Sequence, residues 1–153
     1  MMAAAEWGYE MYGIDTRKEV VEAARALGFN RVATPDEGVK WPRFDVVSMF
    51  DVLEHTPFPR DTIDVYTRLN LRPGGLLVVS CPNSGCYAWD ALGDENPYWG
   101  ELEHYHNFTR ARLVSLLAEC GFEFVSYSVS RRWRLGMEII ARKVAVDDVV
   151  RPR

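Results

Sequence analysis

The sequence predicts an α/β fold built on an open, mostly parallel sheet with an antiparallel hairpin at its carboxyl end. Short apolar runs alternate with stretches of helical periodicity, which is the pattern of successive βαβ units. Two strand-like runs, 122–130 and 136–143, then follow one another with no helix between them. Such a pair makes a hairpin, and a hairpin added to a parallel sheet makes the sheet mixed.

The first elements are expected in a regular order that glycines and caps delimit. The end of a helix over 1–7 stops at Gly8, and Gly28 ends the next helix. Thr16 is the expected N-cap of that second helix. The predicted elements are a helix over 1–7, a strand over 9–14, a helix over 18–27 and a short strand over 29–33.

The rest of the chain begins with a nearly continuous apolar run, which is typical of a strand buried on both faces. Arg72–Gly75 reads as a tight turn, Asn83–Asn107 as a long irregular stretch, and Thr109 as a helix cap. A basic connector, with Arg131, Arg132 and Arg134 around Trp133, joins the final strands. The predicted elements are a strand over 44–50, a helix over 59–69, a strand over 76–81, a helix over 110–120 and the two strands of the hairpin.

Length and composition narrow the function classes. The 153 residues suit a single domain, 1–153. The net charge of −4 argues against nucleic acid or an anionic membrane as a partner, and no apolar run approaches a membrane span of about 20 residues. Three cysteines with no C-x-x-C spacing predict a reduced, cytoplasmic setting.

Asp15 is the first candidate site residue because it directly follows a predicted strand. Ligands of open α/β sheets bind at the carboxyl ends of the strands. A carboxylate there has two oxygens that can accept both hydroxyls of a ribose. With equal weight, Asp15 is part of the cap of the next helix.

Four segments follow one another along the chain: YEMYGID, FDVVSMFDVLEH, LRPGGLLVVSCPN and HYHNFTRARLVSLLAECGF. Together they resemble class I S-adenosylmethionine-dependent methyltransferases, in the small-molecule branch that includes quinone-biosynthesis O-methyltransferases. The resemblance implies a Rossmann-like sheet, S-adenosyl-L-methionine as cofactor, and methyl transfer to an oxygen or nitrogen of a small-molecule acceptor. A dehydrogenase using NAD shares the acidic residue but not the D-V-L-E-H and R-P-G-G pair.

The same resemblance implies a set of cofactor-binding residues. Asp15, with Thr16, would contact the adenosine ribose, and the segment Thr34–Asp36 would flank the adenine. Residues closing the strand at 44–50 would line the cofactor cleft. The expected cofactor-binding residues are Asp15, Thr16, Asp36, Met49, Phe50 and Asp51. Core packing is the alternative role for Phe50.

Glu54, His55, His104 and His106 are the candidate catalytic residues. In the resembled branch the L-E-H triplet lies near the transferable methyl, and a histidine suits removal of a proton from an acceptor hydroxyl. The alternative is that Glu54 and His55 cap the following helix or pair with each other. His104 and His106 either share a metal with nearby carboxylates or belong to a loop over the acceptor pocket; we expect the loop and no metal. The aromatic-rich segment 84–107 is thus the expected acceptor-site loop or lid.

The resemblance also implies a first strand and a glycine-rich turn ahead of Asp15, and this sequence has neither. We therefore expect a truncated domain whose first strand is missing and whose neighbouring strands expose apolar edges. Such edges predict a homodimer or other self-association. An inactive methyltransferase-like domain that acts in self-association or regulation is the alternative function.

Overall fold

The computed structural model describes residues 1–131 and 134–144 of the chain. Arg132 and Trp133 of the basic connector lie outside the described residues, as does the segment 145–153. The chain divides into two compact units, Met1–Trp41 and Pro42–Arg153. We describe each unit by itself.

The first unit is built from short elements. Helix α1 (Met2–Glu6) and helix α2 (Lys18–Ala26) accompany strands β1 (Gly13–Ile14) and β2 (Val32–Ala33), and a 3₁₀ turn (Pro35–Glu37) follows. The two strands pair in parallel over two residues each. The predicted order is therefore confirmed, but both strands are shorter than the apolar runs at 9–14 and 29–33 indicated.

The start of α2 differs from the prediction. Arg17, and not Thr16, is the N-cap residue, and it makes no side-chain cap hydrogen bond. Instead the Arg17 backbone N–H donates to Asp15 Oδ1 at 2.9 Å. Asp15 is the better acceptor here because its ionised oxygen attracts the N–H groups at a helix start more strongly than a hydroxyl does.

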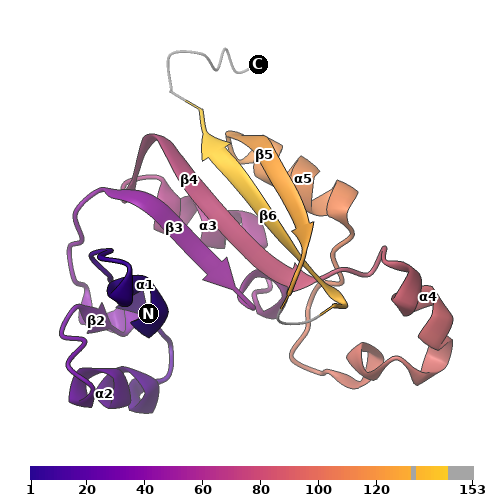
Figure 1. The fold of residues 1–153 in the computed structure, drawn as a ribbon, viewed down its shortest axis with the longest axis horizontal. Coiled ribbons are helices and arrows are strands. Elements are labelled where there is room, and N and C mark those ends of the chain that lie inside the picture. Colours follow the sequence, from indigo (N-terminus) through magenta and orange to yellow (C-terminus); the bar gives the residue numbers. More distant parts are fainter. Residues whose placement is uncertain (132–133, 145–153) are drawn as a thin grey trace. The chain divides into compact units, whose positions relative to one another are not determined.

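The second unit holds a four-stranded mixed sheet (Figure 1) in the order β3-β4-β6-β5. Strand β3 (Phe44–Phe50) runs parallel to β4 (Leu71–Pro82), and β6 (Gly136–Lys143) is antiparallel to both β4 and β5 (Phe122–Val129). The predicted carboxyl-terminal hairpin is confirmed. Helices α3 (Pro59–Thr67) and α5 (Arg110–Glu119) lie on one face of this sheet.

That face of the sheet and the two helices enclose the core of the second unit. Ile63 of α3 and Leu113 of α5 are fully buried against Leu77 of β4 and Ile139 of β6. Thr109 caps α5 as predicted, since its hydroxyl accepts the Arg112 N–H at 3.2 Å. Because β3 and β4 end at the same edge of this packed layer, the residues that follow them are held on a rigid support.

The R-P-G-G segment lies within β4 and does not precede it. Phe44 pairs with Leu71 but Val46 pairs with Leu76, so the chain from Arg72 to Gly75 forms an irregularity in the strand. A side chain at Gly75 would come within 3.0 Å of the Asp45 carbonyl oxygen. The glycine therefore permits the close approach of two backbones.

The segment 84–107 is more regular than the sequence indicated. It contains helix α4 (Tyr87–Leu92) and two 3₁₀ turns, Gly93–Glu95 and Pro97–Gly100. Its frequent aromatic residues pack on one another, which supplies the local order that the polar and glycine-rich composition concealed. Within the described residues, no helix combines the length and the apolar character that a membrane crossing demands.

Candidate functional site

The chain reverses sharply where β3 ends. Asp51 has a φ of 52°, and its N–H donates to the Ser80 carbonyl at 2.9 Å. Aspartate tolerates this left-handed conformation better than most residues. A single 3₁₀ turn, Leu53–His55, follows and buries Leu53 in the core. The turn thereby fixes Glu54 and His55 at the carboxyl edge of the sheet.

Glu54 is a buried carboxylic acid without a full set of partners. Only 1% of its surface is exposed, and Oε2 has no hydrogen-bond partner. Burial raises its pKa from 4.5 to about 7, and the negative charge of Asp51 adds to the rise. Near neutral pH, Glu54 therefore exchanges a proton readily, as a general acid or base must.

Two histidine rings meet at this carboxyl. The rings of His55 and His104 pack edge to face with centroids 4.5 Å apart. One ring nitrogen of each, together with a carboxylate oxygen of Glu54, lie within 4.8 Å of one another. Burial and the neighbouring His55 lower the pKa of His104, whose Nδ1 is buried without a partner. We call these three side chains the Glu54–His55–His104 cluster.

This cluster joins two segments that are far apart in the sequence. The Glu54 carbonyl accepts the N–H of Tyr105 at 2.8 Å and that of His106 at 3.3 Å. His55 Nδ1 donates to the Glu103 carbonyl at 3.2 Å, which leaves the opposite ring nitrogen as an acceptor. The end of the 84–107 segment is thus held on the turn after β3.

His106 occupies a different place from the other two histidines. Its Nε2 lies 3.3 Å from the Pro57 carbonyl and donates to it, and its ring packs on Phe108. The sequence placed His104 and His106 together by their spacing. The structure brings His104 to Glu54 and uses His106 to fasten the loop.

The three cluster residues also meet a geometric condition for metal binding. Their spacing is short enough for one small cation to be shared by an oxygen and two imidazole nitrogens. Among the described residues this is the only group of that kind. It contains Glu54 and His104 but has His55 in place of His106, so it differs from the His104–His106 pair of the metal alternative. That no metal is bound stays a prediction.

Aromatic rings extend the cluster into the loop. Tyr98 stacks on His104, with centroids 5.4 Å apart and planes 21° apart. Trp89 also stacks on Tyr98, with centroids 5.1 Å apart and planes 5° apart. Trp89 is 4% exposed, and Trp99 packs edge-on against it at 5.7 Å. This aromatic column, Trp89–Tyr98–His104, orders the 84–107 segment.

The candidate adenosine residue Asp15 lies in the first unit, at the carboxyl end of β1. Arg17 Nε and Nη2 each donate to one of its oxygens at 3.0 Å. These bonds lower the pKa of Asp15, so it is ionised near neutral pH. Oδ1 also accepts the Arg17 backbone N–H, so both of its lone pairs are used, and one lone pair of Oδ2 remains. While paired with Arg17, the carboxylate can therefore accept one ribose hydroxyl of the implied cofactor.

The other expected cofactor residues occupy diverse environments. Thr16 and Asp36 are exposed. Thr34 forms a capping box with Glu37, whose Oε1 accepts the Thr34 N–H at 3.0 Å. Met49 is buried in the core, whereas Phe50 is 55% exposed. Phe50 therefore does not have the core-packing role that was its alternative.

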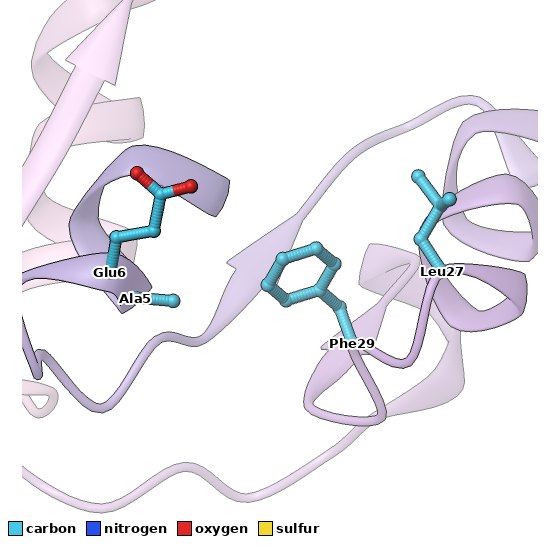
Figure 2. Close-up of a pocket in the computed structure, with 4 residues that line it drawn as sticks. All are labelled: Ala5, Glu6, Leu27 and Phe29. Carbon is cyan, nitrogen blue, oxygen red and sulfur yellow. The ribbon is translucent and has the colours of Figure 1, made fainter.

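A shallow hollow of about 380 Å³ lies in the first unit (Figure 2). Ala5 and Glu6 of α1 line one side, and Leu27 and Phe29, which follow α2, line the other. It contains none of the expected site residues. Glu6 is its only ionisable lining residue, so the hollow lacks the convergent polar groups of a catalytic pocket.

The order and placement of these residues agree with a family match. A family model described as "Methyltransferase domain" matches residues 1–127. The chain belongs to this methyltransferase family. The class I S-adenosylmethionine-dependent methyltransferase assignment made from the sequence is thereby confirmed.

The chain is also similar to curated O-methyltransferases. The methyltransferase chain is 32% identical over 149 residues to a "Ubiquinone biosynthesis O-methyltransferase" of Xanthomonas oryzae pv. oryzae, covering 85% of this chain and 61% of the relative. It spans about three fifths of that relative's length.

Solved structures confirm the Rossmann-like fold class. A methyltransferase from Methanosarcina mazei described as SAM-dependent gives a TM-score of 0.66 at 22% identity, covering 94% of this chain and 86% of the other. The 1,6-didemethyltoxoflavin-N1-methyltransferase of Burkholderia thailandensis, solved with S-adenosylhomocysteine, gives a TM-score of 0.66 at 22% identity. The match covers 94% of this chain and 65% of the other.

Two residues that contact the candidate site residues or their loop were not identified from the sequence. Arg17 pairs with Asp15, and an arginine two residues after a strand-ending acid was the available signal. Asn96 is 2% exposed and has an unpartnered Nδ2, while its Oδ1 accepts the Tyr98 N–H at 3.1 Å. The Asn-Pro pair before two aromatic residues marked this turn.

Proposed function

We propose that this protein transfers a methyl group from S-adenosyl-L-methionine to an oxygen or nitrogen of a small-molecule acceptor. The observation that carries the proposal is the buried, unpartnered carboxyl of Glu54 with two histidines at the carboxyl edge of the sheet. Membership of the methyltransferase family supports the reaction class. An oxygen acceptor is favoured because the relatives above 30% identity are named as O-methyltransferases.

S-adenosyl-L-methionine, when bound, supplies an electrophilic methyl group on a positively charged sulfur. Asp15 would accept a ribose hydroxyl through its ionised carboxylate, with Thr16 and Asp36 as further adenosine contacts. In the second unit, Phe50 and Asp51, beside the buried Met49, would contact the cofactor. The exposed ring of Phe50 offers an apolar surface there.

His104 would accept the proton that the acceptor hydroxyl loses when it is methylated, and S-adenosylhomocysteine would be the product released. The lowered pKa of His104 keeps the imidazole neutral and able to accept that proton. Glu54 then orients and stabilises the imidazolium, and His55 packs beside it. His106 contributes by holding the loop. Because methyl transfer depends chiefly on in-line positioning, we expect these groups to contribute less than the alignment of the reactants.

The segment 84–107 forms the acceptor side of the site as a loop or lid. Its aromatic column favours a flat acceptor that can pack against rings. The acceptor is a metabolite and neither nucleic acid nor a membrane, in line with the net charge of −4. Free thiols at Cys81, Cys86 and Cys120 support a cytoplasmic location.

Two measurements test the proposal on the full chain. Calorimetric titration with S-adenosylhomocysteine is expected to show binding that Asp15→Asn weakens, with Asp36→Asn as a milder change. Methyl transfer is then assayed with catechol and aniline as simple oxygen and nitrogen probes, comparing wild type with Glu54→Gln. Absence of binding at millimolar S-adenosylhomocysteine would refute cofactor use by this chain.

Self-association through sheet edges is the second candidate role, with or without catalysis. Strand β3 is an edge of the four-stranded sheet, and Val46 and Phe50 on it are 46% and 55% exposed. An open apolar edge favours pairing with another chain. Light scattering should show a dimer or larger species that Val46→Lys weakens and Val65→Lys, on α3, does not. A monodisperse wild-type monomer would contradict this role.

A further inference from the structure

Tyr98 occupies an unusual place for a tyrosine in a loop. It belongs to the 3₁₀ turn Pro97–Gly100, yet its ring stacks on the ring of Trp89 and on that of His104. Asn96 fixes its backbone by accepting the Tyr98 N–H at 3.1 Å. Ring and backbone are therefore both constrained, which a side chain that merely fills space does not require.

His104 is constrained from several sides. Its N–H donates to the Glu101 carbonyl at 3.1 Å, and the next two N–H groups donate to the Glu54 carbonyl. These bonds fix the backbone but leave the imidazole free to rotate about its side-chain bonds. The imidazole contacts the ring of Tyr98, which stacks on it, and the ring of His55, which packs edge to face with it. The orientation of the imidazole therefore depends on ring packing.

We infer that Tyr98 is a positioning residue, which with Trp89 behind it holds the imidazole of His104 toward Glu54 and covers it from water. This inference deepens the proposed function, because it rests on His104 as the proton acceptor. Tyr98 contacts no reacting atom and acts only through His104. Trp89, as the buried end of the column, prevents Tyr98 from swinging away.

The pKa of His104 should report whether the ring of Tyr98 covers the imidazole from water. Burial lowers the pKa of His104, and the positive form of His55 lowers it further. Glu101, Asp51 and Glu103 act in the opposite direction, and Glu54 adjoins the ring. If the tyrosine ring is removed, water reaches the imidazole. Burial, which lowers the pKa of His104 most, then becomes weaker. The pKa of His104 should then rise toward the ordinary histidine value.

Histidine NMR of the full chain tests this directly, because the chain contains only three histidines. Ring signals are followed through a pH titration for wild type, Tyr98→Leu and Tyr98→Phe. We expect Tyr98→Leu to raise the midpoint of His104 and Tyr98→Phe, which keeps the ring, to leave it in place. Tyr87→Leu is the matched control, since Tyr87 lies in the same segment but is 86% exposed.

A wild-type measurement covers the case in which Tyr98→Leu disorders the loop. Cross-relaxation between the ring protons of Tyr98 and His104 is expected from their 5.4 Å stacking distance. Absence of that signal, or an unchanged His104 midpoint in a folded Tyr98→Leu variant, overturns the inference.

Activity separates this inference from the proposed function. With the catechol probe, Tyr98→Leu should lower kcat on the order of tenfold with a smaller change in KM, and move the acid limb of the pH profile upward. Tyr98→Phe, which keeps the ring, should have a kcat and an acid limb close to those of the wild type. If no preparation transfers methyl groups although the His104 midpoint shifts as expected, the proposed function fails while the positioning contact stands.

Discussion

The two units of this protein hold their carboxylates by different physical means. In the first unit the buried apolar side chains among the described residues are Val21, Val32 and Ala33, and ion pairs such as Arg17–Asp15 lie on the surface. In the second unit a continuous core reaches the turn that carries Glu54. Asp15 is therefore kept ionised by a partner, whereas Glu54 is kept protonated below about pH 7 by burial.

This difference suits the two tasks that we propose for these carboxylates. A ribose-binding carboxylate must be charged and accessible, which a surface ion pair provides at little energetic expense. A group that exchanges protons near neutral pH must be shielded from water, which only a packed core provides. Disturbing the core should therefore affect stability and the Glu54 site together, whereas disturbing the first unit should affect mainly the charge at Asp15.

The largest expected effect is loss of a core side chain in the second unit. Leu77→Ala removes a fully buried leucine from β4, and we expect the free energy of unfolding to fall by about 2–5 kcal/mol. Leu27→Ala in the first unit, where the side chain is 70% exposed, should change it by less than about 0.5 kcal/mol. Urea unfolding followed by circular dichroism measures both. Equal losses would mean that the units are not packed as differently as described.

Glu54→Gln should give the next largest effect, and the effect depends on pH. The folded-state pKa of Glu54, about 7, lies above its ordinary 4.5, so between these values the native state holds a proton that the unfolded chain releases. The wild type should therefore lose about 3 kcal/mol as pH rises from 4.5 through 7.

The glutamine variant should lack that loss, so its advantage over wild type should grow with pH. Urea midpoints at several pH values provide the measurement. Glu22→Gln is the control because Glu22 is 61% exposed on α2. A wild-type stability that stays level over this pH range would show that Glu54 is not held protonated.

Replacing a glycine by alanine should have a smaller effect on stability, and its size should depend on how easily the neighbouring atoms can move. An added methyl at Gly75 would lie 2.9 Å from the Arg72 carbonyl oxygen and 3.0 Å from that of Asp45, and backbone cannot move aside cheaply. Gly75→Ala should therefore cost about 1–3 kcal/mol. At Gly13 the nearest atom, at 2.9 Å, is the flexible Met1 sulfur, so Gly13→Ala should cost less than about 1 kcal/mol. Thermal unfolding of the two variants compares them, and a reversed order would contradict this account.

Sequence patterns predicted the parts of the fold that local chemistry determines. Thr109 and Gly121 delimit α5 because a hydroxyl cap and a left-handed glycine (φ 84°) act within a few residues. The hairpin of β5 and β6 was visible for the same reason. The strands of the first unit were predicted too long, because strand length depends on pairing partners that an apolar run does not reveal.

The site was predictable in its residue types but not in its grouping. Glu54 and His55 follow from their place after a buried strand. The pairing of His104 with Glu54, and of His106 with Pro57, depends on how the 84–107 segment folds back over a long sequence separation. The stacking of Tyr98 on His104 has no local signature at all, since the two residues are six positions apart and a turn brings their rings together.

Arg17→Ala should give the smallest effect on stability and so completes the contrast with Glu54. The Arg17 and Asp15 side chains are 65% and 30% exposed, so water screens the pair and we expect a loss of only about 0.5 kcal/mol at pH 7. The bonds to Arg17 place the folded-state pKa of Asp15 below its ordinary 3.8. The contribution of the pair is therefore present above 3.8 and disappears as pH falls through that lowered pKa. Carboxyl NMR of Asp15 should show its pKa rising in the variant. A loss above about 2 kcal/mol at pH 7 would mean that Asp15, like Glu54, is held by the interior of its unit and not at its surface.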